Sequence, residues 1–321
     1  MTSTSNNLKL APGLAEFIQR FDSVMPPDFY TRPVESQRKL YGNLVREFHY
    51  DRPPRLAIRD ELLQAGAQQL PIRIYRPEGP GPQPCLLYLH GGGFALGGME
   101  THDTIMAEVA AKTGVTVIAV DYRLAPEHPF PAGLEDCYAA LLAVAANPGR
   151  FDIDPQRLGV GGDSSGGNFA VGLSMMVRER GGPKLRAQVM ISPVLDLRRW
   201  ADKPPSSEPG LPLLSDGEMR FFTRTYLGPA MEVEHPYASP LLAGNFAQLP
   251  PAYIMGAEMD PLRIDGELYA ERLSAAGVPV ELAVEPGLVH ACLRARSACA
   301  EVASAFDRFC AATRRLLAGE P

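Results

Sequence analysis

Long apolar segments are missing from this chain of 321 residues. Its longest unbroken apolar run covers residues 138–146, whereas a membrane-spanning helix needs about 20 residues. Residues 1–10 are rich in Ser, Thr and Asn and contain no apolar signal segment. The sequence therefore predicts a cytoplasmic protein without a membrane span.

Paired cysteines and an excess of positive charge are also lacking. The five cysteines are odd in number and none forms a C-x-x-C pair, which argues against a disulfide framework or a zinc knuckle. Lys and Arg number 31 against 37 Asp and Glu, a net charge of −6, and no Lys/Arg cluster is present. We expect free thiols in a reducing compartment and no nucleic-acid partner.

The remaining composition is that of a globular protein with a large core, since 45% of residues are hydrophobic and 21% are charged. Neither G-K-[ST] nor H-E-x-x-H occurs, which argues against a phosphate loop and against metalloprotease chemistry. Short apolar runs typical of buried strands alternate with helical patterns, and this order favours a mostly parallel sheet covered on both faces. The predicted strands are 72–75, 85–89, 115–120, 158–160, 187–191, 252–255 and 280–284, and the predicted helices are 134–146, 169–180, 266–276 and 297–317.

Two segments fall outside this alternation. The first fifty residues contain two amphipathic helical patterns, at 14–24 and 40–48. Residues 198–230 begin with a Pro-rich loop at 204–212, after which Ser215 or Asp216 is a plausible N-cap for another helix. We expect both segments to form a lid over the carboxyl ends of the strands, where open α/β sheets bind ligands.

The strongest motif is Gly162-Asp163-Ser164-Ser165-Gly166, a G-x-S-x-G sequence between a predicted strand and a predicted helix. In this context the serine lies on a sharp turn that exposes its hydroxyl, and the glycines permit the bend. The helix N-terminus also favours developing negative charge there. Ser165 is the competing nucleophile, but the glycine spacing favours Ser164.

A second motif, His90-Gly91-Gly92-Gly93, directly follows the strand predicted at 85–89. Consecutive glycines let a backbone approach a ligand and direct its N–H groups at it. Such a loop forms an oxyanion hole together with the N–H of the residue after the nucleophile, here Ser165. The alternatives are a flexible glycine turn or a dinucleotide loop, but Ser164 occupies the third glycine position of G-x-G-x-x-G.

A serine nucleophile needs a base, and the base needs an orienting acid. Only His235 and His290 follow Ser164, and His290 comes just after the last predicted strand. Asp260 follows the strand predicted at 252–255, with Glu258 and Asp265 as nearby competitors. The order Ser, Asp, His is the one typical of α/β-hydrolases.

Together these segments resemble the hormone-sensitive-lipase-like family of α/β-hydrolases, especially its bacterial carboxylesterases. The resemblance covers roughly residues 70–315 and rests on H-G-G-G at 90–93, D-Y-R-L-A-P-E at 121–127, G-D-S-S-G-G at 162–167, D-P-L-R at 260–263 and His290. It implies an α/β-hydrolase fold with an eight-stranded, mostly parallel sheet flanked by helices, a helical cap, and no metal or cofactor. The implied division is cap helices at 1–50 and a catalytic domain at 51–321, with a cap insertion at about 198–232.

The resemblance also assigns roles to single residues. Ser164 is then the nucleophile, Asp260 the orienting acid and His290 the base. Gly91, Gly92 and Ser165 supply the N–H groups of the oxyanion hole. The chain departs from the family at Ser165, where Ala is common, and at residues 290–292, which read H-A-C instead of H-G-F. The missing Phe leaves the shape of the acyl pocket open, and the cysteine suggests a thiol-sensitive site.

We therefore expect a serine carboxylesterase that hydrolyses short- to medium-chain esters through an acyl-enzyme intermediate. An amide or formamide hydrolase, or a lactonase, would use the same three residues. A catalytically silent small-molecule binding protein is a more distant alternative. Relatives in this family form dimers through the edge of the last strand, and the resemblance implies a homodimer of this kind.

Overall fold

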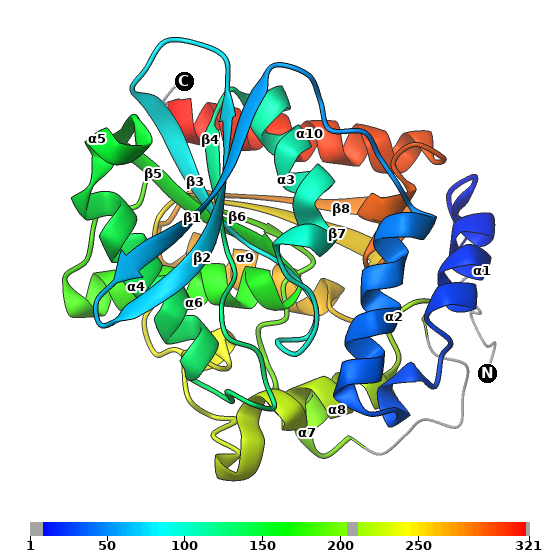
Figure 1. The fold of residues 1–321 in the computed structure, drawn as a ribbon. Helices are drawn as coiled ribbons and strands as arrows, with labels where there is room; N and C mark the ends of the chain where they lie inside the picture. Colours follow the sequence, from blue (N-terminus) through cyan, green and yellow to red (C-terminus); the bar gives the residue numbers. More distant parts are fainter. Residues whose placement is uncertain (1–8, 204–210, 319–321) are drawn as a thin grey trace.

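The computed structural model describes residues 9–203 and 211–318. Its sheet has eight strands in the order β1-β2-β4-β3-β5-β6-β7-β8. Only the β1–β2 and β2–β4 pairs are antiparallel, so the expected eight-stranded, mostly parallel sheet is confirmed (Figure 1). The strands are β1 (Leu56–Ala65), β2 (Gln68–Pro77), β3 (Gln83–Leu89), β4 (Thr116–Val120), β5 (Ile153–Asp163), β6 (Ala187–Ile191), β7 (Ala252–Met259) and β8 (Val280–Val289).

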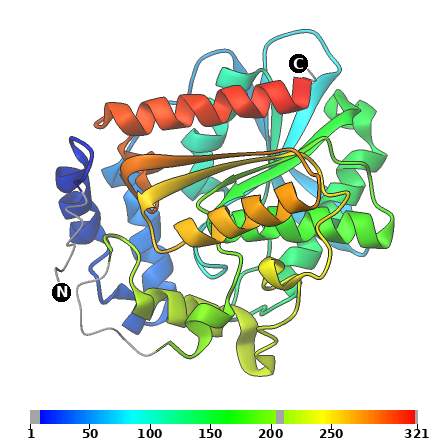
Figure 2. The ribbon, with the colours of Figure 1, turned by 180° about the vertical axis from the view of Figure 1, so that it is seen from behind.

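Helices cover both faces of this sheet (Figure 2). The α-helices are α1 (Leu14–Val24), α2 (Val34–Glu47), α3 (Met99–Thr113), α4 (Ala132–Ala146), α5 (Pro148–Phe151), α6 (Ser165–Arg180), α7 (Arg198–Ala201), α8 (Asp216–Leu227), α9 (Arg263–Ala275) and α10 (Ala300–Ala318). The 3₁₀ helices are η1 (Phe29–Thr31), η2 (Gly228–Ala230), η3 (Pro240–Leu242) and η4 (Cys292–Ala295). Helices α4, α6 and α9 pack in one buried core cluster, and α3 and α10 pack in the other. No helix of residues 9–203 and 211–318 is long and apolar enough to cross a membrane.

Among the elements of ten or more residues, β1 and α3 escaped the sequence analysis. Strand β1 lies at the edge of the sheet, and the polar residues Arg59, Asp60 and Glu61 interrupt its middle, so no apolar run marks it. Helix α3 follows the glycine loop and is buried between β4 and α10, with buried residues on several sides. A helix enclosed in this way lacks the one-sided apolar pattern by which amphipathic helices are identified.

The N-terminal helices and α8 lie near one another beyond the carboxyl ends of the central strands (Figure 1). The rings of Phe29 in η1 and Phe222 in α8 have centroids 6.2 Å apart. Helix α8 begins at a capping box in which Ser215 Oγ accepts from the N–H of Glu218 at 3.2 Å, so Ser215 is its N-cap. Most of the Pro-rich loop expected at 204–212 lies outside the described residues. The division into cap and catalytic domains stays a prediction.

Candidate active site

Ser164 lies on the sharp turn between β5 and α6, with φ 53° and ψ −116°. A positive φ is rare for a residue with a side chain and marks a strained turn. The glycines around it are required sterically. A Cβ on Gly166 would lie 1.9 Å from the carbonyl oxygen of Leu89, and one on Gly162 would lie 2.5 Å from the carbonyl carbon of Gly166. The G-x-S-x-G spacing therefore reflects close backbone packing that holds the Ser164 hydroxyl out of the sheet.

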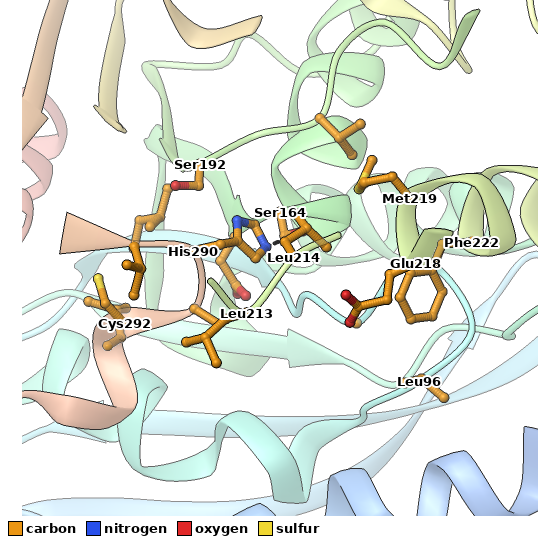
Figure 3. A pocket seen from close by; sticks show the side chains of 18 of the residues that line it. Leu96, Ser164, Ser192, Leu213, Leu214, Glu218, Met219, Phe222, His290 and Cys292 are labelled. Carbon is orange, nitrogen blue, oxygen red and sulfur yellow. Dashed lines mark hydrogen bonds between the residues drawn. The ribbon is translucent and has the colours of Figure 1, made fainter. Parts of the chain in front are cut away.

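The ends of three strands bring Ser164, His290 and Asp260 together. His290 follows β8, and its Nε2 lies 3.2 Å from Ser164 Oγ. Figure 3 shows the imidazole directed toward Ser164. Its Nδ1 lies 2.8 Å from Oδ2 of Asp260, which follows β7. Asp260 is buried, and its Oδ1 accepts the N–H of Leu262 at 2.8 Å. This hydrogen bond fixes Oδ1 and so keeps Oδ2 directed toward the imidazole of His290.

The competing residues are engaged elsewhere. Asp265 accepts the N–H of Leu195 at 2.7 Å and pairs with Arg199 at 2.6 Å. Glu258 accepts the N–H of Gly287 at 2.8 Å. His235 Nδ1 accepts the N–H of Tyr237 at 3.1 Å, in the loop before η3. Of the candidates named from the sequence, only Asp260 and His290 form a continuous chain to Ser164.

The environment of His290 favours its protonated form. Burial alone would lower the pKa of His290, but the charge of Asp260 and the hydrogen bond to it outweigh burial, so the pKa is raised above the ordinary imidazole value. Asp163 and Glu218 add smaller contributions to the pKa in the same direction. An imidazole with these neighbours is well suited to accept a proton from Ser164 and to stabilise the resulting charge.

The glycine loop differs from the expectation at Gly91. Its N–H donates to Oδ1 of Asp163 at 3.2 Å, so this donor faces away from the nucleophile. Gly92 and Gly93 line the pocket around Ser164, whereas Gly91 is not among the described residues that line it. A Cβ on Gly91 would lie 2.2 Å from Asp163 Oδ2. The first glycine of the motif therefore makes room for a carboxylate, and the next two border the reacting centre.

Asp163 is a site residue that the sequence analysis left without a role. Its carboxylate accepts the Tyr88 hydroxyl at 3.0 Å and the Gly91 N–H, and its Oδ2 lies 3.2 Å from Nε2 of His102. Burial would raise the pKa of Asp163, but His102 and Tyr88 outweigh burial and lower the pKa to about 2. The only signal in the sequence was its position before the nucleophile. The partners lie on β3 and α3, and spacing along the chain does not reveal them.

A pocket opens at Ser164 and is walled largely by apolar side chains (Figure 3). Cys292 lines it, and burial raises the pKa of this thiol to about 12. A thiol with this pKa is neutral at ordinary pH, which argues against the expected sensitivity. Further lining residues are Phe21, Met25, Phe29, Leu96, Leu213, Leu214, Met219, Phe222 and Met255. Within the described residues, no group of three or more His, Cys, Asp or Glu side chains is arranged to hold a metal ion.

Comparison with known proteins agrees with this geometry. Residues 86–294 match a family model described as the alpha/beta hydrolase fold. The carboxylesterase NlhH of Mycobacterium tuberculosis is 39% identical over 261 residues, covering 78% of this chain and 80% of that protein. An ethyl acetate hydrolase of Pseudomonas putida is 39% identical over 232 residues, covering 70% of this chain and 72% of that protein.

Solved structures give the same result. The esterase of the archaeon Pyrobaculum calidifontis matches with a TM-score of 0.87 and 32% identity, covering 96% of this chain and 99% of that one. A bacterial heroin esterase matches with a TM-score of 0.86 and 33% identity, covering 96% and 98% of the two chains. The chain belongs to the hormone-sensitive-lipase-like family of α/β-hydrolases, and it is a carboxylic ester hydrolase.

Proposed function

We propose that this ester hydrolase cleaves short- to medium-chain carboxylic esters through an acyl-enzyme formed on Ser164. The observation that carries the proposal is the hydrogen-bonded chain from Asp260 through His290 to Ser164, with distances of 2.8 and 3.2 Å. Ser164 Oγ attacks the ester carbonyl carbon while its proton moves to Nε2 of His290. Asp260 holds the imidazole in the required tautomer and stabilises its positive charge.

The tetrahedral intermediate places a negative charge on the former carbonyl oxygen. We assign its stabilisation to the N–H groups of Gly92, Gly93 and Ser165, with Gly93 taking the place first expected of Gly91. The engagement of the Gly91 N–H by Asp163 supports this revision. When the intermediate collapses, His290 returns the proton to the leaving alcohol. Water then attacks the acyl carbon and gives a proton to His290. When this second intermediate collapses, the bond to Ser164 Oγ breaks, His290 passes the proton to Oγ, and the acid leaves free Ser164 behind.

The preference for small esters is supported by two observations. The walls of the pocket are mostly apolar, which suits an uncharged acyl chain. A relative of 39% identity is named an ethyl acetate hydrolase, and one of 32% identity from Saccharolobus solfataricus, covering 89% of this chain and 93% of that protein, is named an arylesterase. No feature of the pocket favours an amide or a lactone, and the esterase relatives do not support a silent binding protein.

The test is hydrolysis of p-nitrophenyl acetate, butyrate, octanoate and laurate by the wild-type enzyme and Ser164→Ala. Ser174→Ala is the matched control, because it removes a hydroxyl from the same helix α6. Within residues 9–203 and 211–318, this hydroxyl donates only to the carbonyl of Ala170. We expect Ser164→Ala to lose more than about 10³-fold in kcat and Ser174→Ala to stay close to the wild type. Near wild-type turnover by Ser164→Ala would refute the assignment. Butyryl p-nitroanilide and a γ-lactone, assayed in parallel, test the alternative activities.

We also propose a cytoplasmic location and a homodimer. All five cysteines are free thiols and buried, which suits a reducing compartment. Strand β8 lies at one edge of the sheet, so its outer side is open to pairing with a second copy. The mass in solution, measured by light scattering, tests the dimer against a monomer of 34.8 kDa.

A further inference from the structure

Glu218 places a carboxylate in the wall of the active-site pocket. It lies in the first turn of α8, is 8% exposed and lines the pocket that contains Ser164 and His290. Figure 3 shows its carboxylate directed into the cavity between Leu213 and Phe222. Its neighbours in this part of the wall, Leu213, Leu214, Met219 and Phe222, are apolar. A buried carboxylate in such a wall is costly unless it meets a partner.

Only one of the two carboxylate oxygens of Glu218 is hydrogen-bonded by the described residues. Oε2 accepts the N–H and the hydroxyl of Ser215, both at 2.7 Å, and so completes the capping box of α8. Within residues 9–203 and 211–318, Oε1 has no hydrogen-bond partner and Glu218 forms no ion pair. Burial raises the pKa of Glu218, and the opposing contributions of the Ser215 hydrogen bonds and of His290 do not offset it. Helix capping accounts for the position of Oε2, and Oε1 stays available to a ligand.

The position of Glu218 relative to the reaction follows from Phe222, one turn later on the same face of α8. The Phe222 ring packs on the oxyanion loop so closely that a Cβ on Gly93 would lie 2.4 Å from it. Phe29 of η1 lies beside Phe222, with ring centroids 6.2 Å apart. The carboxylate of Glu218 and the two aromatic rings thus line the same pocket, and carboxylates and aromatic rings both attract cations.

The positively charged groups that line the pocket are bonded to residues other than Glu218. Arg294 donates to the carbonyl of Thr101 at 2.9 Å, and its guanidinium carbon lies 5.5 Å from the centre of the Tyr41 ring. His290 is bonded to Asp260 and Ser164. Among residues 9–203 and 211–318, the pocket therefore presents an acceptor near Phe222 to which no protein donor is hydrogen-bonded.

We infer that Glu218 selects esters that carry an ammonium group, which binds to Oε1 against the rings of Phe222 and Phe29. The inference rests on the proposed esterase site and adds a substrate class to it. An ammonium group that gives up water needs a carboxylate and aromatic faces around it, and these residues supply both. The ammonium can lie on the alcohol or on the acyl side of the ester, and the test separates the two.

The test compares each cationic ester with a neutral analogue of the same shape. On the alcohol side, butyrylcholine is compared with 3,3-dimethylbutyl butyrate. On the acyl side, the p-nitrophenyl ester of 4-(trimethylammonio)butyrate is compared with that of 5,5-dimethylhexanoate. The measured quantity is the ratio of kcat/KM for the cationic and the neutral ester. Because both values come from the same enzyme sample, partial unfolding of a variant cancels in the ratio.

The decisive variant is Glu218→Gln, since Gln also serves in a capping box and only the charge is lost. Asp216→Asn is the matched control, because it removes the same charge from the same turn of α8 but faces Lys203 outside the active-site pocket. We expect Glu218→Gln to lower the ratio about tenfold or more for at least one pair and Asp216→Asn to leave both ratios unchanged.

A failure of the inference on Glu218 can be distinguished from a failure of the proposed function. If the wild type hydrolyses the neutral esters but Glu218→Gln has the wild-type ratio for both pairs, the inference on Glu218 is overturned and the esterase assignment stands. An equal fall in the ratios of Asp216→Asn and Glu218→Gln would also overturn it. The effect would then come from the total negative charge of this part of the protein and not from contact with Glu218. If the wild type hydrolyses none of the four esters, the proposed function itself fails.

Discussion

At the scale of single residues, the proposed mechanism makes activity depend on the protonation of His290. In that mechanism the neutral imidazole accepts the Ser164 proton, so kcat/KM should fall as the pH drops through the pKa of His290. Because Asp260 raises this pKa, we expect the acid limb of the pH profile to lie above the ordinary imidazole pKa of about 6.5. The measurement is kcat/KM for p-nitrophenyl butyrate between pH 5 and pH 9.

Asp260→Asn tests the cause of that raised pKa. Without the carboxylate charge, the acid limb should move to lower pH, and kcat should fall by roughly 10³–10⁴-fold because the imidazole loses its orientation. Glu271→Gln, an exposed substitution on α9, is the control and should change neither quantity. An acid limb at the same pH in Asp260→Asn and the wild type would show that Asp260 does not set the pKa of His290.

Cys292 lies next to the catalytic centre, but we expect it to resist alkylation. Its pKa of about 12 and its exposure of 3% leave very little accessible thiolate at pH 8. Wild type and Cys292→Ser incubated with iodoacetamide should therefore keep the same fraction of their activity. Rapid inactivation of the wild type alone would contradict the burial of this thiol.

At the scale of elements, the loop between β3 and α3 and the helix α8 depend on each other. Gly93 has φ +60°, and a Cβ there would meet the Phe222 ring at 2.4 Å. We expect Gly93→Ala to displace α8 or the loop and to lower kcat by about 10²-fold or more, the usual effect of losing an oxyanion donor. Circular dichroism should show that the fold is kept.

Gly114→Ala is the matched control for this loop. Gly114 has a similar φ of +70°, but nothing lies within 4 Å of the position of its Cβ. The same backbone strain should cost about 1 kcal/mol of unfolding free energy while kcat stays at the wild-type value. Equal losses of kcat in both variants would show that strain, and not contact with Phe222, is responsible.

At the scale of the whole molecule, Arg38 links the N-terminal helices to the catalytic core. From α2, its Nη1 and Nη2 donate to the two carboxylate oxygens of Glu127, each at 2.7 Å. Its Nε donates to the carbonyl of Ala95 at 2.9 Å, and its Nη2 to that of Ala125 at 3.0 Å. The N-terminal segment also contributes Phe21 to the pocket, so its attachment affects the binding of substrate.

We therefore expect Arg38→Met to loosen this segment. The free energy of unfolding should fall by about 1–2 kcal/mol, since the ion pair is partly exposed but two carbonyls also lose a donor. KM should rise more than kcat falls, and trypsin should cleave the first fifty residues faster. Arg46→Met on the same helix, which is exposed, is the control. An unchanged KM would show that the N-terminal helices do not shape the pocket.

The part of the site that could be predicted from sequence is the part encoded locally. A strand followed by a tight glycine turn and a helix identifies Ser164, because the turn geometry depends on neighbouring residues only. His290 and Asp260 could be predicted because each follows a buried strand, and parallel strands end at one edge of the sheet. Buried apolar runs likewise predicted the central strands, whereas the polar edge strand β1 and the enclosed helix α3 carry no comparable pattern.

The tertiary structure alone decided the contacts between distant segments. Ser164 and His290 are 126 residues apart, and which carboxylate orients the imidazole depends on how the strand ends are arranged. The engagement of Gly91 by Asp163 and the placement of Glu218 in the pocket also arise between separate elements. The sequence by itself thus determined the fold class and the family, and it named the proposed reacting groups, because these rest on local periodicity and short motifs. The direction of each donor and the chemistry of the pocket wall depend on long-range packing, which no local pattern encodes.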